Sequence, residues 1–280
     1  MLQWIHSPKN TQVAKYIKCY WLIEKTTLQD THNFPKLNPD PSAHLIICPQ
    51  AQHYHYDTAA IASDGNGSHW LYPQQKTLRL DHTQRFVCLG VKFHVGALYS
   101  VDIPNYNHPS LNSAASIEIA EWLSVTDFSV ESLLQLGRTE PLVCCAKLDE
   151  LFLPLLNNAI EDQHSEITRK ALPLLDSTPI STLGEKLCCS QRTLERSFNR
   201  VTGLTMKQCQ SMDKLEAMLE YLYQRDATDI DWVDVALTFG FSDQPHLIRQ
   251  LKKQIGLTPK NYIEERGLAI DIYGGVNPSE

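Results

Sequence analysis

Apolar residues in the C-terminal third of the chain recur with the period of an α-helix. Over residues 191–200 they fall on one face, at Leu194 and Phe198. Ser190 stands just before this stretch, where a hydroxyl accepts hydrogen bonds from free backbone N–H groups. The pattern predicts a short capped helix with one buried face, preceded by another short helix over 180–187.

The same construction is repeated further along the chain. Gly240 ends one predicted helix, and Ser242 or Asp243 is placed to cap the next. Leu247 and Leu251 give that next helix its buried face. The chain is therefore expected to contain two copies of a unit in which two helices are joined by a turn.

A longer amphipathic helix is predicted between the two copies, over 205–224. Its apolar residues recur at steps of three and four residues. About 18 residues of helix span ~27 Å, which approaches the ~34 Å of one turn of DNA. One chain is therefore expected to present two helices to successive major-groove segments.

The outward faces of the two second helices carry residue types that suit a major groove. Arginine, glutamine and histidine can read base edges there, and lysine can bind phosphates. Residues 186–207 hold five basic residues against one acid, and residues 244–260 hold four against none. The arginines fall on the outward face in both copies, which favours contact with DNA over ordinary solvated charges.

Residues 182–262 resemble the DNA-binding domain of AraC/XylS-type transcriptional regulators. The resemblance rests on residues 194–198 in the first copy and, more specifically, on residues 235–244 and 256–262 in the second. It extends to a lead-in helix over 166–175. It implies a bipartite helix-turn-helix domain in which the long helix links the two units.

The resemblance also implies which side chains contact DNA. Arg196 and Arg249 are expected to bridge guanine acceptors, and Glu195 to accept from a cytosine amino group. The residues placed for phosphates are Gln191, Asn199, Lys252 and Lys253. The predicted DNA-binding residues are Ser190, Gln191, Arg192, Thr193, Glu195, Arg196, Asn199, Ser242, Gln244, His246, Arg249, Lys252 and Lys253.

Charge sets a limit on how this domain binds. The 280-residue chain has a formal net charge of −7, whereas nucleic-acid-binding domains are usually basic. Two local basic faces on an acidic body predict specific binding with modest non-specific affinity. Asp213 and Ile263 depart from the family pattern, at positions where basic residues are common, so phosphate contacts are not expected there.

The N-terminal part consists of short β-rich runs separated by turn signals. Several strands at this spacing predict a sandwich or barrel. This part resembles the cupin-like β-barrel sensory domain of many AraC-type regulators, which implies a small-molecule or protein signal. The predicted strands lie at 20–23, 44–48, 53–56, 68–72, 77–80 and 85–93.

The fold class expected from these patterns is α+β with two domains. Helices are predicted at 116–123, 129–136 and 141–160, and Pro154 is expected to kink or split the last. The wide apolar stripe of that helix leaves two readings open, packing against the barrel or a dimer face. The predicted regions are a β-rich sensory domain over 1–103, a helical segment over 104–161, a linker at 162–165 within the DNA-binding domain over 162–266, and a C-terminal tail over 267–280.

Candidate catalytic chemistry is weak in this sequence. His53 and His55 lie on one face of a predicted strand, a geometry that can bind metal, but no glutamate stands at the spacing that a barrel enzyme uses. The eight cysteines form no Cys-x-x-Cys pair, and none has the four-ligand zinc spacing of a methyl-accepting repair protein. We therefore expect no enzyme, no catalytic residue, no metal and no cofactor; the alternative is a metal-binding β-barrel enzyme with an appended DNA-binding tail.

The expected function is sequence-specific, DNA-binding regulation of transcription, with activation favoured by family habit. The expected partners are double-stranded DNA, RNA polymerase and a small-molecule effector, with a homodimer left open. No apolar run reaches the ~18 residues of a membrane span, and the cysteine usage fits the reducing cytoplasm.

Overall fold

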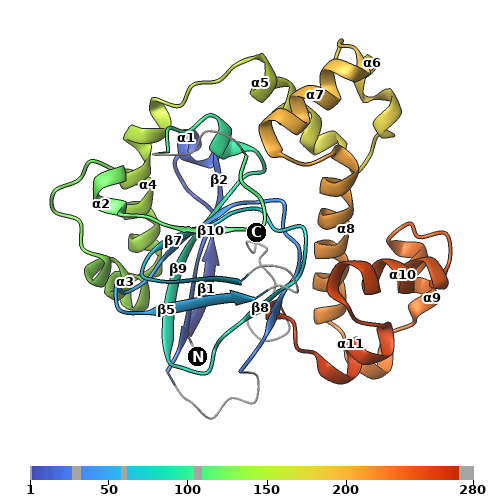
Figure 1. Ribbon diagram of the computed structural model, residues 1–280, viewed down its shortest axis with the longest axis horizontal. Coiled ribbons are helices and arrows are strands. Elements are labelled where there is room, and N and C mark those ends of the chain that lie inside the picture. Colours follow the sequence, from blue (N-terminus) through green and yellow to red (C-terminus); the bar gives the residue numbers. More distant parts are fainter. Residues whose placement is uncertain (1, 27–32, 58–61, 104–108, 271–280) are drawn as a thin grey trace.

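The computed structural model describes residues 2–26, 33–57, 62–103 and 109–270. An N-terminal β-domain and a C-terminal helical domain lie side by side, and further helices cover the far side of the β-domain (Figure 1). This arrangement confirms the α+β, two-domain class. Residues 104–108 of the predicted helical segment and residues 271–280 of the predicted tail fall outside the described residues.

Two antiparallel sheets form the β-domain. The larger has the order β1-β2-β9-β4-β7-β10, and the smaller has the order β3-β8-β5-β6. The strands are β1 (Leu2–His6), β2 (Ile17–Lys25), β3 (Lys36–Leu37), β4 (His44–Ile47), β5 (His53–Asp57), β6 (Ala62–Asn66), β7 (His69–Leu71), β8 (Leu78–Leu80), β9 (Phe86–Phe93) and β10 (Ala114–Ser116).

The predicted strands match β2, β4, β5, β7, β8 and β9, while β1, β3, β6 and β10 have no counterpart in the prediction. In β6, the sequence around Gly65 reads as a turn, yet Gly65 pairs with Tyr54 of β5. Gly65 also lies under the Tyr54 ring, where a Cβ would be 2.5 Å from the hydroxyl. Strand pairing and packing of the Tyr54 ring therefore override the local preference of this sequence for a turn.

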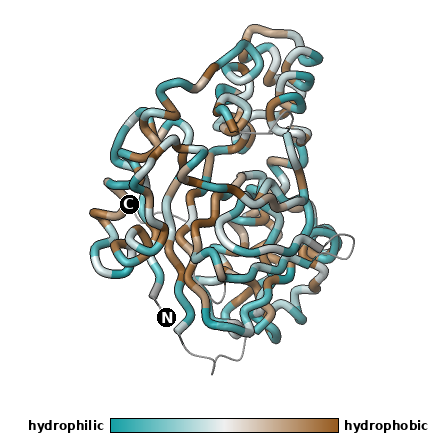
Figure 2. The backbone as a smooth tube through the Cα atoms, turned by 60° about the vertical axis from the view of Figure 1, so that its left-hand side comes forward, coloured by the Kyte–Doolittle hydropathy of each residue, from teal (hydrophilic) through white to brown (hydrophobic). Residues whose placement is uncertain are grey.

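Helices α1 (Thr11–Ala14), α2 (Ile119–Trp122), α3 (Val130–Thr139) and α4 (Pro141–Asn157) belong to the β-domain. Cys144, Leu148 and Phe152 of α4 join Leu45 and Phe93 of the larger sheet in one buried core. The hydrophobic strands of this core run through the centre of the domain (Figure 2). The apolar stripe of α4 thus packs mainly against the sheet, and Pro154 lies inside the helix without splitting it.

The predicted linker at 162–165 is wrong, because these residues begin helix α5 (Gln163–Ala171). The Asp162 side chain accepts hydrogen bonds from the backbone N–H groups of His164 and Ser165, and the Ser165 hydroxyl accepts one from the Asp162 N–H. This reciprocal capping box uses the polar residue types that also occur in loops, which explains the error.

The C-terminal domain contains α6 (Leu183–Lys186), α7 (Gln191–Thr202), α8 (Met206–Tyr223), α9 (Trp232–Thr238), α10 (Gln244–Ile255) and α11 (Pro259–Glu265). The long helix α8 contributes to two separate cores. Met206 packs with Phe198 of α7 in the first, and Leu219 packs with Leu247 and Leu251 of α10 in the second. This sharing confirms that two helical units are attached to one long helix. Helix α8 is called the rod below.

The first unit begins with shorter helical elements than the sequence predicts. Instead of one helix over 180–187, a 3-10 turn at Ile180–Thr182 leads into the short α6. A Cβ at Gly184 would lie 2.9 Å from both the Cys189 carbonyl oxygen and the Gln191 nitrogen. Glycine therefore permits the close approach of α6 to the start of α7.

A buried ion cluster joins the β-domain to α8. Nζ of Lys92, on β9, lies 2.8 Å from Oδ2 of Asp40 and 3.0 Å from Oε1 of Glu216 on α8. Burial disfavours the Lys92 ammonium, but the charges of Asp40 and Glu216 outweigh that effect and raise the pKa of Lys92 above its ordinary value. His44 Nε2 also lies 3.0 Å from Asp40. The middle of the rod is therefore tied to the larger sheet.

We expect Lys92→Met to destabilise the folded protein by about 3–5 kcal/mol, because it leaves two largely buried carboxylates without their counter-charge. Urea denaturation at neutral pH measures the loss. Lys147→Met is the matched control: Lys147 pairs with Glu150 at the surface, and such pairs contribute about 0–1 kcal/mol. Equal effects of the two substitutions would contradict the role of Lys92.

Candidate nucleic-acid interface and neighbouring cavity

The second helix of each unit begins with a side-chain cap. The Ser190 hydroxyl accepts from the Thr193 N–H at 3.1 Å at the start of α7. At the start of α10, Asp243 Oδ1 accepts from the His246 N–H at 2.6 Å. Asp243, not Ser242, is thus the cap, and the Ser242 hydroxyl lies 3.2 Å from His246 Nδ1.

The two second helices also end alike. Each runs for 12 residues and stops at a glycine with positive φ, Gly203 at 71° and Gly256 at 72°. Only glycine adopts this left-handed backbone at little cost. The duplicated sequence pattern therefore gives two helices of equal length with the same boundaries.

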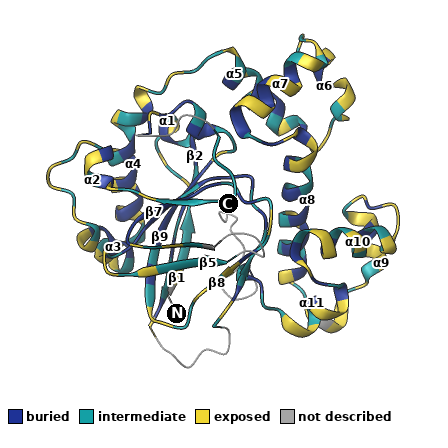
Figure 3. Cartoon of the chain, in the orientation of Figure 1, coloured by how far each residue is buried: buried dark blue, intermediate teal, exposed yellow. Residues whose placement is uncertain are grey.

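The basic side chains of both helices face solvent. Arg192 and Arg196 on α7, and Arg249, Lys252 and Lys253 on α10, are exposed, and no described residue forms an ion pair with any of them. Figure 3 shows exposed positions on both units, which lie at different levels along α8. These side chains are free to contact a polyanion.

Some predicted DNA-binding residues have partners within their own helical unit. Gln191 Nε2 donates to Glu195 Oε1 at 2.9 Å, and Gln191 Oε1 accepts from the Gly184 N–H. The Thr193 hydroxyl lies 2.7 Å from that of Ser190. The exposed members of the predicted set are Ser190, Arg192, Glu195, Arg196, Asn199, Ser242, Arg249, Lys252 and Lys253, and the half-buried ones are Gln191, Thr193, Gln244 and His246.

The β-domain contacts both second helices at their C-terminal ends. Arg200 Nε donates to the Tyr99 hydroxyl at 3.0 Å, and the Thr77 hydroxyl donates to the Gln254 carbonyl at 2.6 Å. These contacts leave the outward arginines uncovered. They join segments far apart in the chain, so no local periodicity in the sequence predicts them.

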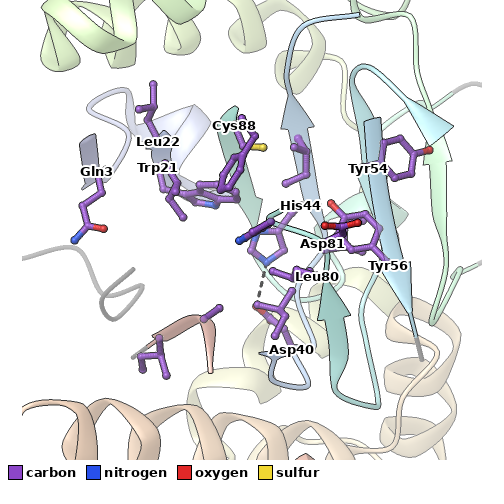
Figure 4. Close-up of a pocket in the computed structure, with 18 of the residues that line it drawn as sticks. Gln3, Trp21, Leu22, Asp40, His44, Tyr54, Tyr56, Leu80, Asp81 and Cys88 are labelled. Atoms are coloured by element: carbon purple, nitrogen blue, oxygen red, sulfur yellow. Dashed lines mark hydrogen bonds and ion pairs between the residues drawn. The ribbon is translucent and has the colours of Figure 1, made fainter. Parts of the chain in front are cut away.

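A cavity of about 510 Å³ lies between the two sheets and reaches α8 (Figure 4). Trp21 and Leu22 of β2 line one side, and Tyr54 and Tyr56 of β5 line another. Its remaining walls include Glu216 and Glu220 of α8 and Ala269 and Ile270 beyond α11. The cavity therefore touches the rod that joins the two helical units.

Family models match both parts of the chain. Residues 183–265 match a family model described as a helix-turn-helix domain, HTH_18, and residues 6–102 match DUF6597, a domain of unknown function. The C-terminal domain is a helix-turn-helix domain of the AraC type, and the chain is a DNA-binding transcription regulator. No curated protein matches the sequence of this regulator.

The regulator also has similarities to solved structures. ToxT from Vibrio cholerae is 9% identical with a TM-score of 0.43, and 88% of this chain and 97% of that chain are covered. An apo form of ToxT is 8% identical with a TM-score of 0.47 and the same coverage. The AraC-like transcriptional activator CuxR is 11% identical with a TM-score of 0.25, covering 77% of this chain and 86% of its own.

The predicted histidine pair of the regulator lies on the exposed part of β5. His53 Nε2 is 2.6 Å from Asp64 Oδ1, and His55 Nδ1 is 3.6 Å from the same oxygen. Among the described residues, no group of three or more His, Cys, Asp or Glu side chains is arranged to hold a metal ion. Within the same ranges, no helix has both the length and the apolarity needed to cross a bilayer.

Asp213, a departure from the family pattern, faces the β-domain side of α8 of the regulator. Burial raises the pKa of its carboxyl to about 6, and the charges of Glu216 and Asp40 add to this, while a hydrogen bond from the Cys209 thiol opposes it. Asp213 is half-buried and does not lie among the exposed arginines of α7 and α10.

Asp213→Asn is expected to stabilise the regulator above pH 6. The folded-state pKa of the Asp213 carboxyl is raised from 3.8 to about 6. The protonated carboxyl therefore contributes its full stabilisation below pH 3.8, and this contribution is lost as the pH rises to about 6. Asparagine cannot ionise, so the variant should gain on the order of 2 kcal/mol at pH 8 and nothing at pH 3.5. Urea denaturation across pH measures this difference. The exposed Asp229→Asn serves as control, and a gain that does not vary with pH would refute the assignment.

Proposed function

We propose that this regulator binds an operator of two blocks about one helical turn apart, with α7 in one major groove and α10 in the next. The observation that carries the proposal is the pair of equal-length helices with exposed, unpaired basic faces, held on one rod. The rod itself holds 18 residues, or ~27 Å of helix. A single chain is thus long enough to reach both grooves.

The proposed contacts divide between bases and phosphates. Arg196 and Arg249 bridge guanine O6 and N7, as exposed arginines on recognition helices do. Glu195 accepts from a cytosine amino group, and its hydrogen bond from Gln191 at 2.9 Å fixes its direction. Lys252 and Lys253, near the end of α10, bind phosphates and set the register of the helix.

We propose further that a small molecule in the cavity controls DNA binding. The cavity is bounded by both sheets and by α8, so an occupant touches the β-domain and the rod together. A ligand that prefers one arrangement of these parts shifts the population toward it. The C-terminal ends of α7 and α10, which contact Tyr99 and Thr77, convey the change to the DNA-binding helices.

The remaining parts of the proposal follow the family. The protein acts in the cytoplasm as a non-enzymatic activator and contacts RNA polymerase at the promoter. Homodimer formation through α4 is supported by Leu142 and Val143, which are 53% and 50% exposed while the rest of the apolar stripe is mostly buried.

Selection of bound DNA from a random pool tests the two-block operator. The expected motif has two conserved blocks whose centres lie about one turn apart. Insertion of half a turn between the blocks should abolish tight binding, because α8 cannot turn one unit to the opposite side of the duplex. Recovery of a single block, or tolerance of the insertion, would count against simultaneous binding by α7 and α10.

Arg196→Ala and Arg249→Ala should each cost about 1–3 kcal/mol of specific binding and relax the base preference in one block only. Titration of labelled operator DNA measures the affinity. Arg85→Ala removes an exposed arginine of the β-domain and is expected to leave affinity unchanged. If both test variants match this control, the assigned recognition faces are wrong.

Lys252→Ala should weaken binding to all sequences equally and reduce the slope of log affinity against log salt by about 1. The expected reason is the loss of one phosphate contact and its released counterion. Affinity measured at several salt concentrations gives the slope. An unchanged slope with altered base preference would move Lys252 from phosphate binding to base recognition.

A further inference from the structure

We propose that residues 267–270, called the strap below, form one wall of the effector site and fasten the second helical unit to the β-domain. The strap follows α11, so it belongs to the DNA-binding part of the chain. This inference rests on the proposed control of DNA binding through the cavity and names the segment that carries it. Such a role requires the strap to contact the second unit, the β-domain and the cavity at once.

The strap is part of the core of the second helical unit. Leu268 is 0% exposed and Ile270 is 7% exposed, and both belong to the apolar cluster that contains Leu247 and Tyr262. Leu247 lies on α10 and Tyr262 on α11. Because such a core is closely packed, a shift of the strap changes the packing beneath α10.

The strap also pairs with the β-domain. The Lys36 N–H of β3 donates to the Gly267 carbonyl at 2.9 Å, and Lys36 and Leu268 form a parallel β-bridge. Strand β3 is at the edge of the smaller sheet, and such an edge offers backbone groups to a further segment. The Lys36 ammonium lies 3.6 Å from Glu265 at the end of α11, a surface contact that adds little to the pairing.

The far end of the strap lies on the cavity wall. Ala269 and Ile270 line the cavity together with Leu37, which directly follows Lys36 on β3. Figure 4 shows the strap in pale red beside the cavity. The same four residues therefore contact the core of the second unit, the smaller sheet and the effector site.

The cavity of about 510 Å³ is present with the strap in place, so an occupant does not have to displace the strap. An apolar occupant gains contact with Ala269 and Ile270 only while the strap is paired with β3. A ligand that binds one of two states shifts the population toward that state. Occupancy of the cavity is thus expected to hold the second unit against the β-domain.

The first helical unit has a different connection to the β-domain. Its contact runs from Arg200 to the Tyr99 hydroxyl, and neither residue is among the described residues that line the cavity. Through the strap, occupancy of the cavity therefore acts on α10 and not on α7.

Hydrogen exchange at the Lys36 amide tests the strap directly, because this N–H donates to the Gly267 carbonyl. Ile270→Ser removes apolar contact at the buried end of the strap and should speed exchange of the peptide that contains Lys36 at least tenfold. Ile160→Ser is the matched control, since Ile160 is 80% exposed and its loss should leave that exchange unchanged. Equal exchange in Ile270→Ser and the wild type would overturn the proposed role of the strap.

A neutral apolar probe, 4-phenylbutanol, tests the link between the strap and the cavity in the full chain. Tryptophan fluorescence reports its binding, because Trp4 and Trp21 line the cavity. At millimolar concentration the probe should slow the Lys36 exchange about threefold or more in the wild type, and Ile270→Ser should weaken probe binding about tenfold. Binding without slower exchange, or no binding, would overturn the proposal.

Ala269→Leu distinguishes a wall of the effector site from a segment that only supports the fold. The longer side chain adds apolar contact and fills part of the cavity, so the Lys36 exchange should slow while probe affinity falls about tenfold. This variant also keeps the test decisive if Ile270→Ser does not fold. Unchanged probe affinity in Ala269→Leu would contradict the assignment of the strap to the effector site.

Operator binding by the same variants separates this inference from the proposed function. Ile270→Ser should change the affinity for the two-block operator and leave binding to the α7 block alone unchanged. If the strap responds to the probe but operator affinity changes with neither the probe nor the variant, the strap stands and control through the cavity fails. If the probe alters operator affinity equally in the wild type and in Ile270→Ser, control through the cavity stands and the strap fails.

Discussion

The contact of Lys92 with Asp40 and Glu216 is the interaction on which the arrangement of the domains depends. It places a buried ammonium between the larger sheet and the middle of α8, with distances of 2.8 and 3.0 Å. Separating the domains would take Glu216 away from the buried Lys92 ammonium and leave the ammonium with Asp40 alone, and breaking a buried ion pair is costly. The sheet therefore holds the same rod to which both DNA-binding units are attached.

Helix α8 is held in place because both helical units pack against it. Its first half completes the core of the unit that contains α7, and its second half completes the core that contains α10. Contacts from Tyr99 and Thr77 to the C-terminal ends of these helices add a second brace from the β-domain. The angle between the DNA-binding helices is therefore set by the rod and by the β-domain together, which is a physical route for a signal in the cavity to reach DNA.

The sequence predicts the helical domain well and the β-domain less completely, for a physical reason. Helices α7, α8 and α10 are specified by local features: apolar periodicity, caps such as Ser190, and glycine stops such as Gly203. The strand β6 and the pairing of Lys92 with Glu216 depend on partners far along the chain. The capping box at Asp162 was equally local, but its residue types do not distinguish a linker from the start of a helix.

The acidity of the helical domain has an explanation in this arrangement. Asp213, Glu216 and Glu220 lie on the side of α8 that faces the β-domain, and the exposed arginines lie on α7 and α10. Screening by salt limits the reach of surface charge to ~8–10 Å, so acids on the inner side of the rod weaken DNA binding little. Two of them, Glu216 and Glu220, line the cavity. A net charge that argues against nucleic-acid binding when summed over the domain is thus compatible with it once the two faces of the rod are considered separately.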